Sequence, residues 1–275
     1  MASYTFNIPG SDAAQGLSAT FFGGIGRRML STIKQVGGIT ELGISAIKVI
    51  FTKRLAFDEF SRQLYVIGNR SFSIVALIAL FTGLVMALQL TVGLGRFGLK
   101  LYVGQVVALA VFRELAPVLS SLMIAARVGS GIAAELGSMV VTEQVLAIEA
   151  MGANPVQKLV VPRLLATTIA APILTIMADI IGIMGGMVIA VREAGVTPQF
   201  YMDQVRTTLT QDDFTSGVTK AFFFGFLVAI ISCFEGLQTQ GGTEGVGRAT
   251  TRAVVLSSIA IFVSDFFLTK LILYF

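Results

Sequence analysis

The chain has 275 residues, of which 55% are hydrophobic and 13% are charged, about half the charged fraction of a typical soluble domain. It has 20 lysines and arginines against 16 aspartates and glutamates, no histidine, no tryptophan and one cysteine, Cys233. This composition excludes an ordinary soluble protein, a Ser-His-Asp triad, a histidine or zinc-cysteine metal site and an intramolecular disulfide.

The N-terminal 70 residues are polar enough to lie outside a bilayer core. We expect residues 1–30 to form a mobile tail and residues 31–70 to form an amphipathic region at the membrane interface. Between Ile33 and Phe51, isoleucines and valine alternate with charged residues in a loosely helical rhythm. A solvated linker is the alternative. No basic segment precedes an apolar core here, so we expect no cleaved signal peptide.

Residues 71–275 are predicted to form a permease domain of five membrane-spanning helices. A helix needs about 20 mostly apolar residues to cross a bilayer. Five stretches are long enough, although four of them contain charges: 71–95, 101–132, 164–191, 217–234 and 253–275. The sequence therefore predicts an all-α integral membrane protein.

The distribution of lysine and arginine predicts the orientation of these helices. With the N-terminus inside, 13 of these residues fall on the inner side and six on the outer side, Lys220 being counted among the outer ones. Cytoplasmic segments carry the excess of positive charge. We therefore expect a cytoplasmic N-terminus and a periplasmic C-terminus.

The second stretch places Arg113 next to Glu114 well inside a span. A charge at this depth is costly, so the pair is expected to face protein or a wet cavity. It either braces two helices or contacts a substrate, where Arg113 suits a phosphate. Pro117, which has no N–H, is expected to weaken the local helix and to free backbone carbonyls.

Other intramembrane features favour packing roles. The small residues and opposite charges of 127–137 predict close helix packing with an ion pair to another helix, and Gly182 to Gly186 is a GxxxG motif of low specificity. Asp179 and Asp265 are single acids within spans. Pairing with Arg127, Arg163 or a hydroxyl is favoured for them over a proton relay.

The loop 138–162 between the second and third spans contains a predicted short helix. It runs from Thr142, a candidate cap, to Gly152, with Pro155 following. An amphipathic helix held between two spans suits the docking of a cytosolic partner, and a helix resting on the membrane surface is the alternative. The chain has no P-loop motif, so an ATP-driven function requires a separate ATPase subunit.

These segments resemble the permeases of the MCE-associated (Mla-type) lipid ABC transporters. The resemblance is carried by FRELAPVLSSLMIAARVGSGIAAELGSMVVTEQVLAIEAMGANPVQKLVVPRLLA from Phe112 to Ala166 and by GVGRATTRAVVLSSIAIFVSDFFLTKL from Gly245 to Leu271. With the segment 83–89, it extends from about Lys53 to the C-terminus. The N-terminal 30 or so residues match nothing in the family.

The resemblance implies a set of functional residues. Those for substrate binding near a lipid cavity are Arg113, Glu114, Leu115, Met86, Leu94 and Phe97. Those on a helix that couples to the ATPase are Glu143, Gln144, Glu149, Met151 and Gly152.

The resemblance also implies the assembly and its activity. We expect a homodimer with a cytoplasmic ABC ATPase dimer, a periplasmic MCE-domain hexamer and, in some systems, a STAS-domain protein. The complex would move glycerophospholipid between the inner membrane and the MCE partner and so maintain outer-membrane asymmetry. The chain itself is expected to have no catalytic residue, metal or cofactor, because ATP and Mg bind to the ATPase.

Three other functions compete with lipid transport as interpretations of the sequence. An ion-coupled secondary transporter would use Glu114, Asp179 and Asp265. A structural membrane anchor would have no substrate. An intramembrane hydrolase is disfavoured because the chain has neither a histidine nor a paired membrane aspartate motif.

Overall fold

The computed structural model describes residues 11–53 and 57–274. The chain divides into two units, residues 1–44 and 45–275. The first contains most of α1, Ser11–Thr52, a continuous helix whose last residues belong to the second unit and which covers the segment 33–51 predicted to be helical. Residues 1–10 of the predicted tail lie outside the described residues, whereas residues 11–30 fall within α1. The location of α1 at a membrane interface stays a prediction.

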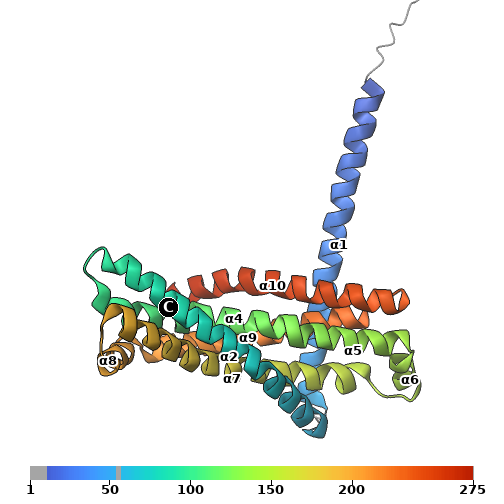
Figure 1. Ribbon diagram of the computed structural model, residues 1–275. Helices are drawn as coiled ribbons and strands as arrows, with labels where there is room; N and C mark the ends of the chain where they lie inside the picture. Colours follow the sequence, from blue (N-terminus) through green and yellow to red (C-terminus); the bar gives the residue numbers. More distant parts are fainter. Residues whose placement is uncertain (1–10, 54–56, 275) are drawn as a thin grey trace, which may run out of the picture. The chain divides into compact units, whose positions relative to one another are not determined.

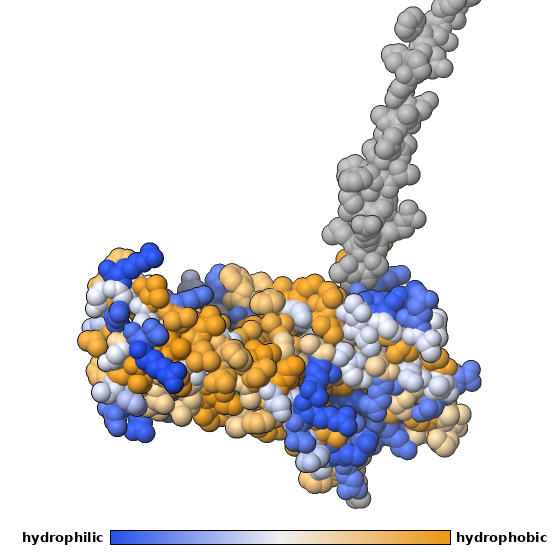
Figure 2. Space-filling view, in the orientation of Figure 1, coloured by the Kyte–Doolittle hydropathy of each residue, from blue (hydrophilic) through white to orange (hydrophobic). Residues whose placement is uncertain are grey.

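The second unit is a bundle of long helices, and no strand occurs among the described residues (Figure 1). The five predicted spans are confirmed, at Phe57–Gly95, Lys100–Val141, Val156–Ala194, Gln211–Leu237 and Gly242–Ile272. In Figure 2 its visible face has a broad apolar area over the middle and more hydrophilic surface toward both ends, as a bilayer requires.

The first span is α2, Phe57–Gly95, which begins 14 residues before the uncharged run that predicted it. Residues 57–70 therefore continue the first span as one helix. The buried residues recur every fourth position along it: Gln63, Ile67, Ser71, Val75, Ala79, Gly83, Ala87 and Thr91. Such a row forms one narrow ridge on a helix, so α2 buries a single stripe and leaves the rest of its surface uncovered.

The second span is interrupted by two short turns with wider hydrogen-bond loops, and the third span begins and ends with such a turn. The second consists of η1 (Lys100–Tyr102), α3 (Val103–Ala110), η2 (Val111–Leu115), α4 (Ala116–Ile124), η3 (Ala125–Gly129) and α5 (Ser130–Val141). The third consists of η4 (Val156–Val160), α7 (Val161–Ile189) and η5 (Ala190–Ala194). Elements η2 to η5 are π turns, which occur often at functional sites.

The remaining elements are α6 (Gln144–Ala150), α8 (Pro198–Thr208), α9 (Gln211–Leu237) and α10 (Gly242–Tyr274). Helix α9 packs against α5, α7 and α10, whereas α2 packs mainly on α7. The window of α10 that defines its span is only 11% buried. Exposed Val255, Ile259 and Phe262 therefore form an apolar surface for lipid or a further protein chain.

Glycines set how closely these helices approach. A Cβ at Gly83 would lie 1.9 Å from the carbonyl oxygen of Gly182, so α2 and α7 touch through their backbones. A Cβ at Gly236 would lie 3.0 Å from the oxygen of Ala133, and one at Gly225 would lie 3.0 Å from that of Thr167. The predicted packing role of the small residues is therefore confirmed for contacts within one chain.

Candidate functional site

The predicted pair Arg113 and Glu114 lies in the π turn η2, in the second span. The turn forms because the N–H of Ala116 donates to the oxygen of Val111, five residues earlier. Pro117 follows and has no N–H for the carbonyl of Arg113, four residues before it. As predicted, the proline leaves a backbone oxygen available inside the span.

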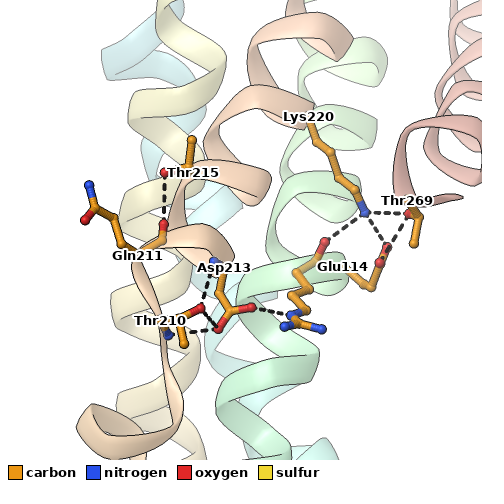
Figure 3. A network of polar contacts seen from close by, with 8 residues as sticks. Glu114, Thr210, Gln211, Asp213, Thr215, Lys220 and Thr269 are labelled. Carbon is orange, nitrogen blue, oxygen red and sulfur yellow. Dashed lines mark hydrogen bonds and ion pairs between the residues drawn. The ribbon is translucent and has the colours of Figure 1, made fainter. Parts of the chain in front are cut away.

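Lys220 of α9 donates to that oxygen, with a distance of 3.0 Å between its Nζ and the Arg113 oxygen. The same Nζ lies 2.8 Å from Glu114 Oε2 and 2.7 Å from Thr269 Oγ1 of α10 (Figure 3). It also forms an ion pair with Asp265 Oδ1 at 3.0 Å. The Lys220 side chain is 1% exposed, so these groups together compensate a buried ammonium.

Arg113 pairs instead with Asp213, near the start of α9, through its Nε–H. Asp213 is buried and completes a capping box, in which its Oδ2 accepts from the Thr210 N–H at 2.9 Å and its own N–H donates to the Thr210 hydroxyl. The same hydroxyl also donates to Oδ2 at 2.9 Å (Figure 3). One carboxylate therefore fixes both the beginning of α9 and the direction of the arginine.

These seven residues form one polar network, which we call the Lys220 cluster: Arg113, Glu114, Thr210, Asp213, Lys220, Asp265 and Thr269. It holds two cations and three carboxylates and joins α9 and α10 to the second span. Although it lies within spans, 44% of the Arg113 side chain and 40% of the Glu114 side chain are exposed on the single chain. Such groups are unfavourable against lipid tails, so their surroundings must be protein or a wet cavity.

The pair Arg113 and Glu114 has the features that both predicted roles require. Arg113 and Glu114 brace the second span against α9, as the structural interpretation expects. They also remain half accessible, as a substrate contact requires. The sequence did not identify Lys220, Asp213, Thr210 or Thr269, because each looks like an ordinary residue at the end of an apolar run.

The predicted apolar cavity residues fall into two groups. Leu115, Met86 and Leu94 are partly buried and pack against one hydrophobic core, formed by α2, the second span, α7 and α8. Leu115 also lines a small apolar hollow together with Val75 of α2 and Ala178 of α7. Phe97 is exposed in the turn after α2 and is not part of this core.

The predicted coupling residues lie in and beside α6. All five are exposed: Glu143, Gln144, Glu149, Met151 and Gly152. Helix α6 itself has no buried residue. Glu149 and Gly152 also border a hollow of about 640 Å³ that reaches Leu237 at the end of α9.

The ends of α6 differ from the prediction that Thr142 caps it. The N-cap residue is Glu143, which adopts a left-handed conformation with φ of 59° and makes no side-chain capping bond. The Thr142 hydroxyl instead donates to Ser138 at the end of α5, at 2.9 Å. The prediction was wrong because this hydroxyl bonds back into its own helix.

The remaining intramembrane charges have different surroundings. Asp265 is paired, but its partner is Lys220 and not the predicted Arg127, Arg163 or hydroxyl, because the sequence placed this lysine on the outer side. Glu135 pairs with buried Arg163 of α7 at 2.8 Å, the predicted ion pair to another helix. Asp179 is buried, and its Oδ1 has no hydrogen-bond partner within the described chain. The expected pairing of Asp179 is therefore not found.

Comparison with known proteins identifies relatives over most of the chain. The profile of the family described as Permease MlaE matches residues 60–271. A probable ABC transporter permease protein of Rickettsia felis is 40% identical over 247 residues, which is 90% of this chain and 95% of the relative. The intermembrane phospholipid transport system permease protein MlaE of Haemophilus influenzae is 33% identical over 252 residues, 91% of this chain and 97% of the relative.

A plant relative extends the range of organisms. The chloroplast protein TRIGALACTOSYLDIACYLGLYCEROL 1 of Arabidopsis thaliana is 38% identical over 209 residues, which is 76% of this chain and 60% of the relative. The resemblance drawn from the sequence is therefore confirmed over the spans and the loop that contains α6.

Proposed function

The chain belongs to the MlaE permease family, and on this premise we propose that it is the membrane subunit of an ATP-driven phospholipid transporter. The observation that carries the proposal is the Lys220 cluster, which leaves Arg113 and Glu114 half exposed within a span. A single chain offers lipid tails a charged surface there. A second copy that covers this surface would enclose a cavity with a polar patch.

In this cavity Arg113 contacts the phosphate of the lipid head group. Its Nε is occupied by Asp213, so the phosphate meets the remaining donors of a guanidinium whose direction is fixed. Glu114, held by Lys220 and Thr269, accepts from an amine or hydroxyl of the head group. Leu115, Met86, Leu94 and Phe97 line the path of the acyl tails.

The two copies meet through surfaces other than the tightest glycine contacts. Gly129, Gly137 and Gly182 already pack within one chain against Ser232, Thr239 and Ala79. These small-residue faces are therefore already used for packing within one chain. The exposed apolar surfaces of α2 and α10 remain available for this contact.

Helix α6 transmits the work of ATP hydrolysis. The exposed Glu143, Gln144, Glu149 and Met151, followed by Gly152, enter a groove of a separate cytoplasmic ABC ATPase dimer, which binds ATP and Mg. Closure of that dimer displaces α6, and the displacement reaches the second and third spans because α6 connects α5 to the third span. Collapse of the cavity then expels the lipid.

Family membership supports a proposal for the remaining partners. We propose an inner-membrane location, a cytoplasmic N-terminus and a periplasmic C-terminus. A periplasmic MCE-domain hexamer receives or delivers the lipid, a STAS-domain protein binds the ATPase in some systems, and the transport maintains outer-membrane lipid asymmetry. The name of the Haemophilus relative, which specifies intermembrane phospholipid transport, supports this assignment.

Reconstitution with the ATPase tests the role of the pair. We expect Arg113→Ala and Glu114→Ala to lower lipid transfer and lipid-stimulated ATPase activity at least about tenfold, as loss of a charge-assisted hydrogen bond predicts. Arg192→Ala, an exposed arginine in η5, is the matched control and should have no effect. Wild-type transfer and ATPase activity in both cluster variants would remove the cavity role.

The ion-coupled transporter makes a different prediction. It requires transport driven by a gradient, and a pull-down would yield the chain without an ATPase. Recovery of an ABC ATPase together with the chain, and transfer that stops when ATP is withheld, would exclude it.

A further inference from the structure

A second polar region lies toward the end of the bundle that carries α6. There a hollow of about 270 Å³ opens between α2 and the second span. Its polar wall consists of Gln63, Arg70, Ser71, Arg127 and Glu135. It is separate from the Lys220 cluster, because Arg113 and Arg127 lie 14 residues apart on one span, about 21 Å along a helix.

The hollow has an excess of positive charge. Glu135 is already paired with Arg163, which approaches from α7 at 2.8 Å. Arg70 and Arg127 are exposed, and neither guanidinium forms an ion pair within the part of the chain that the structure describes. Two uncompensated guanidiniums therefore border one concave space, which is the arrangement that recognises an anionic oxygen group.

The hydroxyl of Ser71 gives independent evidence of a ligand. Ser71 is fully buried, and its Oγ has no hydrogen-bond partner among the residues that the structure describes. A buried hydroxyl is normally satisfied. In the same helix, the Thr91 hydroxyl donates to the oxygen of Ala87 four residues earlier, at 2.7 Å. Ser71 makes no such bond and instead lines the hollow with its donor unused.

We propose that this hollow binds a phosphate group, with Arg70 and Arg127 as its cationic partners and Ser71 as a donor, and that the phosphate belongs to a phospholipid of the adjacent leaflet. Arg70 directly precedes the uncharged run 71–95, so it lies where head groups meet the hydrocarbon core. Exposed Ile74, Leu77 and Phe81 continue along α2 from this point and provide a surface for the tails.

Photolabelling of the full chain tests the site. The chain is placed in phosphatidylcholine nanodiscs with a trace of phosphatidylethanolamine that carries a diazirine on its head group, and labelled peptides are mapped by mass spectrometry. We expect labels within 63–71 and 127–135. Arg70→Gln combined with Arg127→Gln should lower this labelling at least about tenfold, because each lost charge-assisted bond contributes a comparable factor.

Matched controls separate the site from general lipid contact. Ser71→Ala, a small change that preserves the helix, should lower the labelling several-fold, and Arg192→Gln at the opposite end should leave it unchanged. Labelling by a phosphate-free glycosyl diacylglycerol with the same diazirine should be absent from these peptides. Unchanged labelling in the double variant, or equal labelling by the phosphate-free probe, would overturn the proposal.

Two further experiments identify the source of the phosphate and separate this site from the proposed transport role. Competition by millimolar inorganic phosphate would keep the phosphate site but assign it to free phosphate compounds and overturn the lipid assignment, whereas resistance to it supports a lipid. Arg113→Ala should leave labelling of 63–71 unchanged even where it abolishes transfer. The two proposals can therefore fail independently.

Discussion

The second span contains two π turns that each carry an arginine, and their surroundings differ. At η2, Arg113 is bound to Asp213 of α9, and its neighbour Glu114 is bound to Lys220. At η3, Arg127 forms no ion pair within the described chain and faces a hollow. The same local distortion therefore serves two purposes. Where neighbouring helices supply countercharges it joins the bundle together, and where they do not it presents a cation to a ligand.

The backbone around the two turns differs in the same way. Gly217 of α9 lies so close to η2 that a Cβ there would come 2.5 Å from the Phe112 oxygen. At Gly131, two residues after η3, such a Cβ would meet no atom of the described chain within 4 Å apart from its own helical turn. The first turn is therefore fixed by packing as well as by charge, and the second is open on one side.

Removal of the Lys220 ammonium should have the largest effect on stability among the changes at the two turns. Lys220→Met leaves Glu114 and Asp265 without their shared partner, and we expect it to lower the free energy of unfolding by about 3–5 kcal/mol. Thermal unfolding in detergent measures the loss. Lys270 is an exposed lysine on α10, the helix of Asp265. Lys270→Met is the control and should leave the midpoint of thermal unfolding unchanged.

A compensating variant distinguishes lost charge balance from lost packing. Glu114→Gln and Asp265→Asn added to Lys220→Met remove the unpaired carboxylates, so most of the lost stability should return. If the triple variant unfolds at the same temperature as Lys220→Met alone, the charge balance is not what stabilises η2.

The packing difference predicts the next largest effect. Gly217→Ala forces α9 away from the Phe112 carbonyl, and we expect it to lower the free energy of unfolding by about 1–3 kcal/mol. Gly131→Ala is the matched control beside η3 and should be neutral, or stabilising by up to about 1 kcal/mol, because alanine favours a helix. Equal midpoints for the two variants would contradict the assignment of η2 as the packed turn.

The spans were predictable from the sequence because hydropathy reports the solvent of each segment directly. The partners of the charges were not. Lys220 looks like a flanking cation, since it lies near the beginning of an apolar run, and the approach of the second span and α10 makes it the centre of a cluster. The freed carbonyl at Arg113 was predictable, because the effect of Pro117 is local. The hydrogen bond that Lys220, 107 residues later, donates to that carbonyl was not predictable.

Restoring the missing backbone donor should have a smaller effect on stability. Pro117→Ala supplies an N–H that can donate to the Arg113 oxygen beside Lys220, because a carbonyl accepts two bonds. We expect the free energy of unfolding to change by about 1 kcal/mol or less. Lipid transfer should nevertheless fall clearly below the wild-type rate, because a regular helix redirects Arg113 and Glu114. Transfer at the wild-type level would show that η2 does not depend on the proline.

The smallest effect is expected at the open turn. Arg127→Gln removes no ion pair within the described chain, and we expect the free energy of unfolding to change by less than about 0.5 kcal/mol. Arg113→Gln at η2 should cost more, because it leaves the buried Asp213 carboxylate without its cation. Unfolding of the two variants in phosphate-free detergent measures this difference, since no lipid phosphate then stabilises Arg127. A loss as large for Arg127 as for Arg113 would mean that both arginines act within the bundle.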